Sequence, residues 1–276
     1  MTTPAFDALA FDLDGTVYLS RDPLPGAKAL FEDLDRAGVP YVFATNNSSV
    51  PAASYVERLR SMGIRAGAEH LLTSTQAAAH HLRSAGVARA YVVATDDVRA
   101  ELSDAGVVHD EADPQAVLLT FDTSFAYDKV RAVSHLLRAG LPYFATHPDL
   151  VCPTPEGPVP DCGAFIALFR AATGREPVIL GKPSAGMAAA IRERLTAQAT
   201  ARGKTSPQRV AFVGDRLYTD VRMANDHGFS AVLTLTGEST RAELAASPYR
   251  ADLVVEDLRE LSAHLGLATA EGRPVR

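Results

Sequence analysis

Cysteine is scarce in this chain, and its scarcity excludes one class of protein. Only Cys152 and Cys162 occur among 276 residues, too few for the disulfide framework that stabilises small secreted domains. The first residues, MTTPAFDALAFD, lack the basic start and long apolar stretch of a secretory signal peptide. We therefore expect a reduced, cytoplasmic protein.

Positive charge and long apolar runs are also in short supply. Lys and Arg total 27 against 33 Asp and Glu, which gives a formal net charge of −6. This balance argues against a nucleic-acid polymer as partner, because phosphate backbones are bound by clustered Lys and Arg. It leaves room for a local positive pocket. No uncharged apolar run approaches the ~18–20 residues that span a bilayer, so no membrane partner is expected. The eight histidines show no metal-binding spacing.

The chain does contain a regular alternation of short apolar runs and helical patterns. Hydrophobic residues make up 47% and charged residues 22%, a composition typical of a globular protein with a proper core. Continuous apolar strands that alternate with helices indicate a parallel sheet covered on both faces. The predicted strands are 8–13, 41–47, 90–95, 116–121, 142–146, 177–180, 209–215, 230–235 and 252–255, and the predicted helices are 26–37, 50–62, 74–85, 127–140 and 184–199.

The length of the chain favours two domains rather than one. Single cores tend to split at about 250 residues, and the middle of the chain repeats the strand–helix alternation. We therefore predict a discontinuous first domain over 1–85 and 177–276, with a second α/β domain inserted at 86–176. The polar tail GLATAEGRPVR (266–276) is expected to be frayed.

Four polar stretches follow predicted strands. In an open parallel sheet, ligands bind beyond the carboxyl ends of the strands, so these stretches are expected at one rim. Acids packed together there would repel one another unless a cation neutralised them. Oxygen ligands of this kind suit Mg²⁺ before zinc, and Lys182 would face the anion that the metal contacts. The stretches are Asp12-Leu13-Asp14-Gly15-Thr16, Thr45-Asn46-Asn47-Ser48, Gly181-Lys182-Pro183 and Gly214-Asp215-Arg216-Leu217-Tyr218-Thr219-Asp220.

Each stretch also has a purely structural interpretation. Asp-Gly-Thr after a strand forms a good turn and helix cap, and Asn-Asn-Ser-Ser can cap the helix at 50–62. A lone Gly-Lys-Pro is usually a solvated loop, and GDRLYTD can be a turn before a capped helix. All four in this order, each after a strand, are hard to attribute to chance.

The combination DLDGT, TNN, GKP and GDRLYTD resembles the haloacid dehalogenase (HAD) superfamily, and most closely its NagD-like (class IIA) phosphatase branch. The stretches FDTSFAYDK (121–129) and 145–184, which ends in ILGKPS, are also similar to that branch. The resemblance runs from about residue 8 to 255. It implies a Rossmann-like HAD core with a parallel sheet, plus an inserted α/β cap domain of the C2 type between the second and third motifs, where the insertion is predicted.

The resemblance implies roles for the two carboxylates near the N-terminus. Asp12 would be the nucleophile that forms an aspartyl-phosphate, helped by Mg²⁺ and by Lys182, which neutralise charge on the phosphoryl oxygens. Asp14 would protonate the leaving alcohol and then activate water. Residues i and i+2 of a strand point to the same side, and Gly15 lets the chain turn away, so both carboxylates can flank one phosphate.

The resemblance also implies the ligands of the metal and of the phosphate. The Asp12 carboxylate, the Asp14 backbone carbonyl and the Asp215 carboxylate would bind Mg²⁺. Asp220 would lie behind them, orienting a metal-bound water or Lys182. The phosphate oxygens would be bound, at a helix N-terminus, by Thr45 and by the amides of Asn46 and Asn47.

The cap would contact the leaving group, and so select the substrate, and it would exclude water. Candidate contacts lie in the stretches His147-Pro148-Asp149 and Asp161-Cys162-Gly163-Ala164, with His147, Asp161 and Cys162 as the leading candidates. His147 stands where the branch usually has Asn, and Asp161-Cys162 stands where small residues often occur. Asp161 facing the pocket would disfavour a second anionic group on the substrate, but it can equally be the N-cap of a helix. Cys162 is expected to pack rather than react.

These features favour a Mg²⁺-dependent phosphatase of small phosphomonoesters, such as sugar phosphates, nucleoside monophosphates or p-nitrophenyl phosphate as a surrogate. Two alternatives stay open at this point. One is a phosphomutase of the same superfamily, and the other is a non-enzymatic receiver-like phosphoacceptor, although receiver domains have about 120 residues. Relatives in the branch include cap-mediated dimers, so a homodimer is also open.

Overall fold

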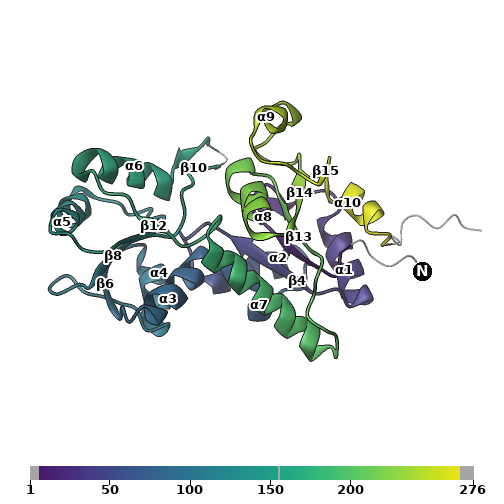
Figure 1. Ribbon diagram of the computed structural model, residues 1–276, viewed down its shortest axis with the longest axis horizontal. Helices are drawn as coiled ribbons and strands as arrows, with labels where there is room; N and C mark the ends of the chain where they lie inside the picture. Colours follow the sequence, from purple (N-terminus) through teal and green to yellow (C-terminus); the bar gives the residue numbers. More distant parts are fainter. Residues whose placement is uncertain (1–5, 155, 268–276) are drawn as a thin grey trace, which may run out of the picture. The chain divides into compact units, whose positions relative to one another are not determined.

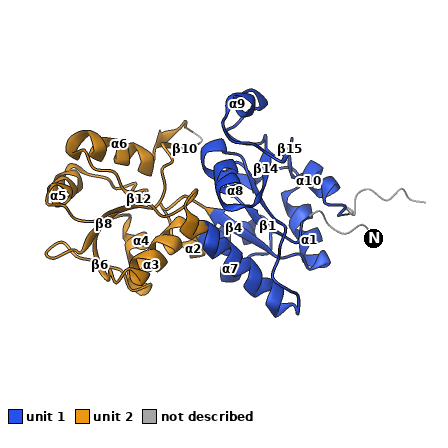
Figure 2. Cartoon of the chain, viewed as in Figure 1, with its two compact units in different colours: residues 1–44, 55–72, 188–276 blue, residues 45–54, 73–187 orange. Residues whose placement is uncertain are grey.

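The computed structural model describes residues 6–154 and 156–267, so residues 268–276 of the predicted frayed tail and the first five residues lie outside it. The chain divides into two compact units (Figure 2): one comprises 1–44, 55–72 and 188–276, the other 45–54 and 73–187. Each unit is described by itself.

The first unit is built on a six-stranded sheet with the order β15-β14-β13-β1-β4-β5. Figure 1 labels β4, β13, β14 and β15 of this sheet. β1 is parallel to both of its neighbours, with Phe11 opposite Val213 on one side and Phe43 on the other. Every residue of β1, β4 and β13 is buried, as expected for strands covered on both faces. The strands are β1 (Ala8–Phe11), β4 (Tyr41–Thr45), β5 (Leu71–Thr73), β13 (Val210–Gly214), β14 (Ser230–Thr234) and β15 (Leu253–Val255).

Aromatic packing joins this sheet to helix α1 (Ala27–Ala37). The Phe31 ring lies 4.9 Å from that of Phe11 and 4.8 Å from that of Phe43. The helix ends at Gly38, whose φ of 63° is the left-handed conformation that glycine adopts without a Cβ clash. The other helices that precede or follow strands of this sheet along the chain are α2 (Ala52–Ser61), α7 (Ala185–Ala201), α8 (Arg222–His227), α9 (Arg241–Ala246) and α10 (Leu258–His264).

The second unit contains a five-stranded parallel sheet with the order β12-β9-β8-β6-β7. Side chains alternate between its faces: Val92 belongs to the core under α3 and α4, and Val93 to the core under α5 and α6. The sheet is therefore covered on both sides. Its elements are α3 (Ser74–Ser84), β6 (Arg89–Val93), α4 (Asp96–Asp104), β7 (Val108–His109), β8 (Ala116–Leu119), α5 (Tyr127–Arg138), β9 (Tyr143–Ala145), α6 (Cys162–Thr173) and β12 (Val178–Ile179).

The predicted fold class, a parallel α/β core of the Rossmann-like HAD type with a second α/β unit, is confirmed. One strand is misplaced by the sequence analysis. The strand predicted at 177–180 is assigned there to the first domain, but β12 pairs with β9 in the sheet of the second unit. The hairpins β2–β3 (Tyr18–Leu19, Asp22–Pro23) and β10–β11 (Val151–Cys152, Val159–Pro160) were not predicted, because two-residue strands carry no periodicity. The cap boundary at 86–176 stays a proposal.

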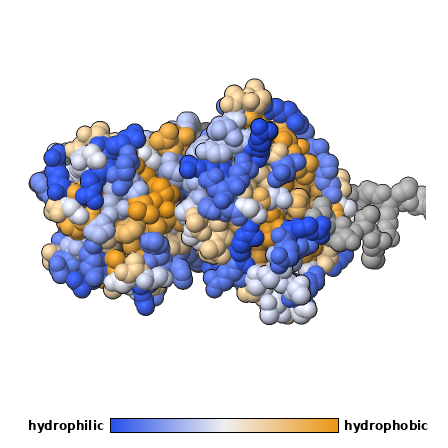
Figure 3. Space-filling view, in the orientation of Figure 1, coloured by the Kyte–Doolittle hydropathy of each residue, from blue (hydrophilic) through white to orange (hydrophobic). Residues whose placement is uncertain are grey.

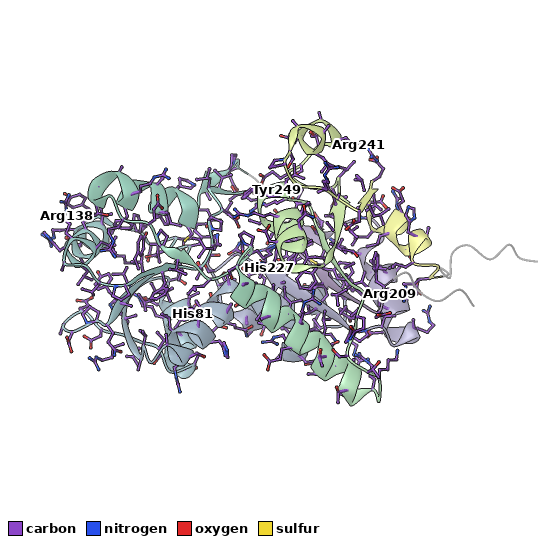
Figure 4. All side chains as sticks on the ribbon, in the orientation of Figure 1. His81, Arg138, Arg209, His227, Arg241 and Tyr249 are labelled. Carbon is purple, nitrogen blue, oxygen red and sulfur yellow. The ribbon has the colours of Figure 1, made fainter. Side chains whose placement is uncertain are left out.

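The surface carries mixed polar and apolar residues. On the face drawn in Figure 3, hydrophilic and hydrophobic residues are interspersed over both units. Charged side chains at the periphery form ion pairs, as between Arg209, labelled in Figure 4, and Asp7 at 2.8 Å. Of the helices in the described part of the chain, none has the length and apolar character needed to cross a membrane.

Candidate active site

Two carboxylates leave neighbouring strands at the carboxyl edge of the six-stranded sheet. Asp12 follows β1 and Asp215 follows β13. The backbone N–H of Asp12 donates to the Val213 carbonyl at 2.8 Å, which continues the parallel ladder to the point where both side chains begin. Both residues are buried, with 6% and 2% of their surfaces exposed. The sequence prediction that these stretches meet at one edge is correct for this pair.

A third carboxylate joins them. Asp12, Asp215 and Asp220 each offer an oxygen that lies within 4.8 Å of the others. Asp220 comes from the short helical turn η2 (Leu217–Val221), and its Oδ2 accepts the backbone N–H of Arg216 at 3.0 Å. Asp220 is predicted to lie behind the metal ligands, and one of its carboxylate oxygens lies within 4.8 Å of an oxygen of each of the other two acids.

The electrostatics of this cluster call for a cation. Burial raises the pKa of Asp215 well above its usual range, and the negative charges of Asp12 and Asp220 raise it further, while the Arg216 guanidinium and the backbone N–H of Glu238 act in the opposite direction. Three buried carboxylate donors with no sulfur or nitrogen among them match the preferences of a hard divalent cation. The residues present therefore fit a metal such as Mg²⁺.

Asp14 lies two residues beyond Asp12 and is partly buried. Its Oδ2 accepts a long hydrogen bond of 3.4 Å from the Tyr18 hydroxyl, and Gly15 turns the chain with a φ of 88°. Burial raises the pKa of Asp14 to about 6, and the charge of Asp12 contributes, while Arg58 lowers it. The same guanidinium lies 5.5 Å from the centre of the Tyr18 ring. Asp14 thus keeps a proton to a higher pH than an ordinary aspartate.

A loop that the sequence analysis missed holds Asp215 in place. The backbone N–H of Glu238 donates to Asp215 Oδ2 at 2.7 Å, and Thr236 Oγ1 donates to the Gly15 carbonyl at 2.6 Å. This loop follows β14, so the rule that polar stretches after parallel strands line the site could have found it. Gly237 lies between these two contacts.

We expect Gly237→Ala to lower the activity of the enzyme strongly, because it displaces Asp215 or the loop beside it. A Cβ at this position would lie 1.9 Å from Asp215 Oδ2, so either the loop or the carboxylate must move. Misplacement of a group by about 1 Å can cost roughly 100-fold in rate, and we expect kcat/KM to fall by about that factor. Steady-state kinetics at several Mg²⁺ concentrations checks this. As a control, Gly186→Ala is a substitution at a helical glycine without a positive φ, and the atom nearest to the added Cβ, Ser184 Oγ, lies 3.9 Å away. Equal activities of the two variants would contradict the prediction.

The second unit brings together the TNN and GKP stretches. The Asn46 side chain makes two bonds to the backbone of Lys182: its Oδ1 accepts the Lys182 N–H at 2.8 Å, and its Nδ2 donates to the Lys182 carbonyl at 3.1 Å. Lys182 is 2% exposed. Thr45 Oγ1 accepts the N–H of Asn47 at 3.1 Å. Residues 136 positions apart are thus joined by one amide group.

The three cap candidates are all buried. His147 and Cys162 are 0% exposed and Asp161 is 3% exposed. Asp161 is the N-cap of α6, where its Oδ1 accepts the N–H of Cys162 at 2.6 Å. Burial raises the pKa of the Cys162 thiol to about 12, so it stays neutral, in agreement with the packing role predicted for it. Asp149, which belongs to the predicted contact stretch His147-Pro148-Asp149, is buried as well, and its Oδ2 accepts the Asn46 Nδ2–H at 3.2 Å.

The fold and the acidic edge define an α/β protein of the Rossmann-like class, with a cluster of buried acids that could hold a cation at the carboxyl ends of its strands. Comparison with known proteins gives the same picture. The family of haloacid dehalogenase-like hydrolases matches residues 9–108, and a HAD-hydrolase-like family matches residues 179–261.

Several characterised or solved proteins are similar over nearly the whole chain. A dihydroxyacetone phosphatase of Corynebacterium glutamicum is 30% identical over 252 residues, 91% of this chain and 89% of its own length. The structure of a 4-nitrophenylphosphatase from Thermotoga maritima is 38% identical, with a TM-score of 0.85, over 94% of this chain and 97% of that one. A protein described as a putative NagD protein is 36% identical, with a TM-score of 0.83, over 95% and 98%.

A glycerol phosphate phosphatase of Mycobacterium tuberculosis, solved in complex with magnesium, is 32% identical, with a TM-score of 0.79, over 93% of this chain and 76% of that one. The chain belongs to the haloacid dehalogenase superfamily, in its NagD-like phosphatase branch. It is accordingly an enzyme, a phosphatase of the HAD type.

Proposed function

We propose that the chain is a Mg²⁺-dependent phosphomonoester hydrolase that acts on small phosphorylated metabolites through an aspartyl-phosphate. The observation that carries this proposal is the buried cluster of Asp12, Asp215 and Asp220, with the proton-holding Asp14 two residues from Asp12. A nucleophile, a proton donor and a cation site at one sheet edge are the parts that phosphoryl transfer needs.

In the first step, an Asp12 carboxylate oxygen attacks phosphorus and the bond from phosphorus to the alcohol oxygen breaks. Asp14 gives its proton to that leaving oxygen. In the second step, the Asp14 carboxylate takes a proton from water, the water oxygen attacks phosphorus, and the bond to Asp12 breaks. Inorganic phosphate leaves and Asp12 is regenerated. A pKa of about 6 for Asp14 suits a group that must be both acid and base.

The Asp12 carboxylate, the Asp14 carbonyl and the Asp215 carboxylate would hold the cation, with Asp220 beside them. Bound Mg²⁺ neutralises negative charge on the acids and on the phosphoryl oxygens. The role proposed for Lys182 is to bind the phosphoryl oxygens as a point charge. Since the Asn46 side chain is engaged with Lys182 and Asp149, a phosphate contact from Asn46 would use its backbone N–H. Thr45 and Asn47 are proposed as the further phosphate-binding residues.

The proposed substrate class is supported by the names of the relatives. They include phosphatases named for dihydroxyacetone, glycerol phosphate and 4-nitrophenyl phosphate. This supports a small phosphomonoester, and a three-carbon or sugar phosphate is the first choice. The burial of His147, Asp161 and Cys162 gives no support to direct substrate contact by these side chains.

The proposal is tested with a panel of phosphomonoesters in the presence of Mg²⁺. We expect release of inorganic phosphate from p-nitrophenyl phosphate and faster release from at least one three-carbon or sugar phosphate. The ranking identifies the leaving group that the enzyme prefers. Formation of an isomeric sugar phosphate without free phosphate would indicate the phosphomutase instead, and a stable phosphate on Asp12 without turnover would indicate a phosphoacceptor.

A further inference from the structure

A buried histidine in the second unit lies between two buried carboxylates. His147 Nδ1 is 3.4 Å from Asp149 Oδ2, and His147 Nε2 is 3.5 Å from Asp161 Oδ1. These distances are within the range of ion pairs and exceed the roughly 3.2 Å upper limit of ordinary N–H···O hydrogen bonds. His147 is 0% exposed, and Asp149 and Asp161 are each 3% exposed. None of the three has a part in the chemistry described above.

The geometry restricts the protonation state of the ring. A neutral imidazole has one N–H donor and one lone pair, and an ionised carboxylate only accepts. A neutral His147 would therefore turn a lone pair towards one of the two carboxylates. An imidazolium donates at both nitrogens and suits both partners.

Both carboxylates have reasons to be ionised. Asp161 Oδ1 accepts the Cys162 N–H at 2.6 Å, at the N-terminus of the 12-residue helix α6, where the helix dipole favours negative charge. Asp149 Oδ2 accepts the Asn46 Nδ2–H at 3.2 Å. The Cys162 thiol is neutral, and Thr146 contributes a hydroxyl 3.8 Å from its sulfur. One cation between two buried anions is the arrangement that reduces the cost of burying them.

Hydrogen bonds and close packing connect Asp149 to Lys182. Asp149 binds Asn46, and Asn46 binds both the N–H and the carbonyl of Lys182. Two glycines show how closely these segments pack: a Cβ on Gly163 would lie 2.1 Å from the Pro148 carbonyl oxygen, and one on Gly181 would lie 2.7 Å from Asn46 Oδ1. A shift of the His147–Asp149 segment must therefore be transmitted to Asn46.

We propose that His147 is a positioning residue, held as an imidazolium between Asp149 and Asp161, and that this bridge fixes Asp149 as the acceptor that orients Asn46 and the Lys182 peptide. The effect on turnover rests on the proposed function of Lys182.

The protonation state is measured directly on the wild-type protein. Two-bond ¹H–¹⁵N correlation spectra of ¹⁵N-histidine-labelled protein report whether each ring nitrogen carries a proton. The His147 signals are assigned by their loss in His147→Asn. We expect both nitrogens of His147 to be protonated at about pH 7.5, where a histidine of ordinary pKa near 6.5 is mostly neutral. A single protonated nitrogen at that pH overturns the proposal, whatever the activity of the enzyme.

Charge compensation is tested by a pair of variants. His147→Asn leaves two buried carboxylates without their cation, and we expect the unfolding temperature to fall by roughly 5 °C or more. Adding Asp161→Asn removes one charge and keeps a good N-cap, so the double variant should recover part of the loss. A double variant no more stable than His147→Asn would refute the bridge. His80→Asn, an exposed histidine on α3, is the matched control and should change nothing.

The positioning role is tested by kinetics at a temperature where every variant is folded. We expect His147→Asn to lower kcat/KM by about 10- to 100-fold, the usual effect of losing a residue that orients an active-site group, and the double variant to regain part of it. Wild-type kcat/KM in a folded His147→Asn would overturn the positioning role. If no phosphomonoester is hydrolysed by the wild type, the proposed function fails, while the spectroscopic and stability measurements still decide the bridge.

Discussion

Asp12→Asn is expected to lose turnover by about four orders of magnitude or more, because a carboxamide has no anionic oxygen to attack phosphorus. The fold should survive, since Asn has nearly the same size and shape. The substitution also removes one of three carboxylates whose oxygens lie within 4.8 Å of one another, so it reduces the repulsion between their negative charges. The unfolding temperature in the absence of divalent cations should therefore be no lower than that of the wild type.

The measurement is phosphate release under saturating Mg²⁺, together with thermal unfolding in EDTA. Asp226→Asn is the matched control, because Asp226 is an exposed aspartate whose carboxylate pairs with Arg222 at 3.2 Å; its rate should equal that of the wild type. Wild-type turnover by Asp12→Asn would overturn the nucleophile assignment. An inactive variant that is also unfolded would not test the nucleophile assignment. The thermal unfolding curve distinguishes loss of the fold from loss of the nucleophile.

Removal of divalent cations is expected to abolish activity to the background rate, and added Mg²⁺ should restore it. The physical reason is the cluster of Asp12, Asp215 and Asp220, whose repulsion is offset only when a cation lies among them. The rate of phosphate release is measured in EDTA and after titration with Mg²⁺. Undiminished release in EDTA, after exhaustive dialysis, would contradict the metal site.

The same cluster predicts how the stability of the cation-free protein depends on pH. The pKa values of Asp215 and Asp14 are raised in the folded state, the latter from 3.8 to about 6, so the folded protein binds more protons than the unfolded chain in this range. Stability due to these groups is therefore lost as pH rises from about 4 through 6 and above. In EDTA, the unfolding temperature should fall over this interval more steeply in the wild type than in Asp215→Asn. Mg²⁺ should reduce the difference.

Much of the acidic cluster at the carboxyl edge of the six-stranded sheet could be predicted, because parallel strands end at the same edge of their sheet. Asp12 and Asp215 each end an apolar run, and strands of one parallel sheet bring their carboxyl ends to the same edge. The adjacency of β1 and β13, with Phe11 opposite Val213, then makes their carboxylates neighbours. The i, i+2 spacing of Asp12 and Asp14 is likewise a property of the extended chain.

Other features depend on contacts that no local pattern encodes. Gly237 matters because its backbone passes against Asp215, 22 residues earlier in the chain, and the sequence around it shows only a polar turn. The strand at 178–179 is two residues long, and its choice of sheet was decided by pairing with β9 rather than by its composition. The contact between Asp149 and Asn46 could not be predicted, because the two residues are 103 positions apart in the chain.

The sequence by itself determined the class of fold, a parallel sheet whose strand ends share one edge, and it supplied the residues on which the proposed chemistry depends: the acids, the lysine and the amides that follow the strands. Only the tertiary structure decided how close Asp220 lies to Asp12 and Asp215, and that His147 lies between Asp149 and Asp161. The reason is physical. Local periodicity fixes on which side of an element a residue points, but the distance between two side chains from separate loops depends on how the elements between them pack.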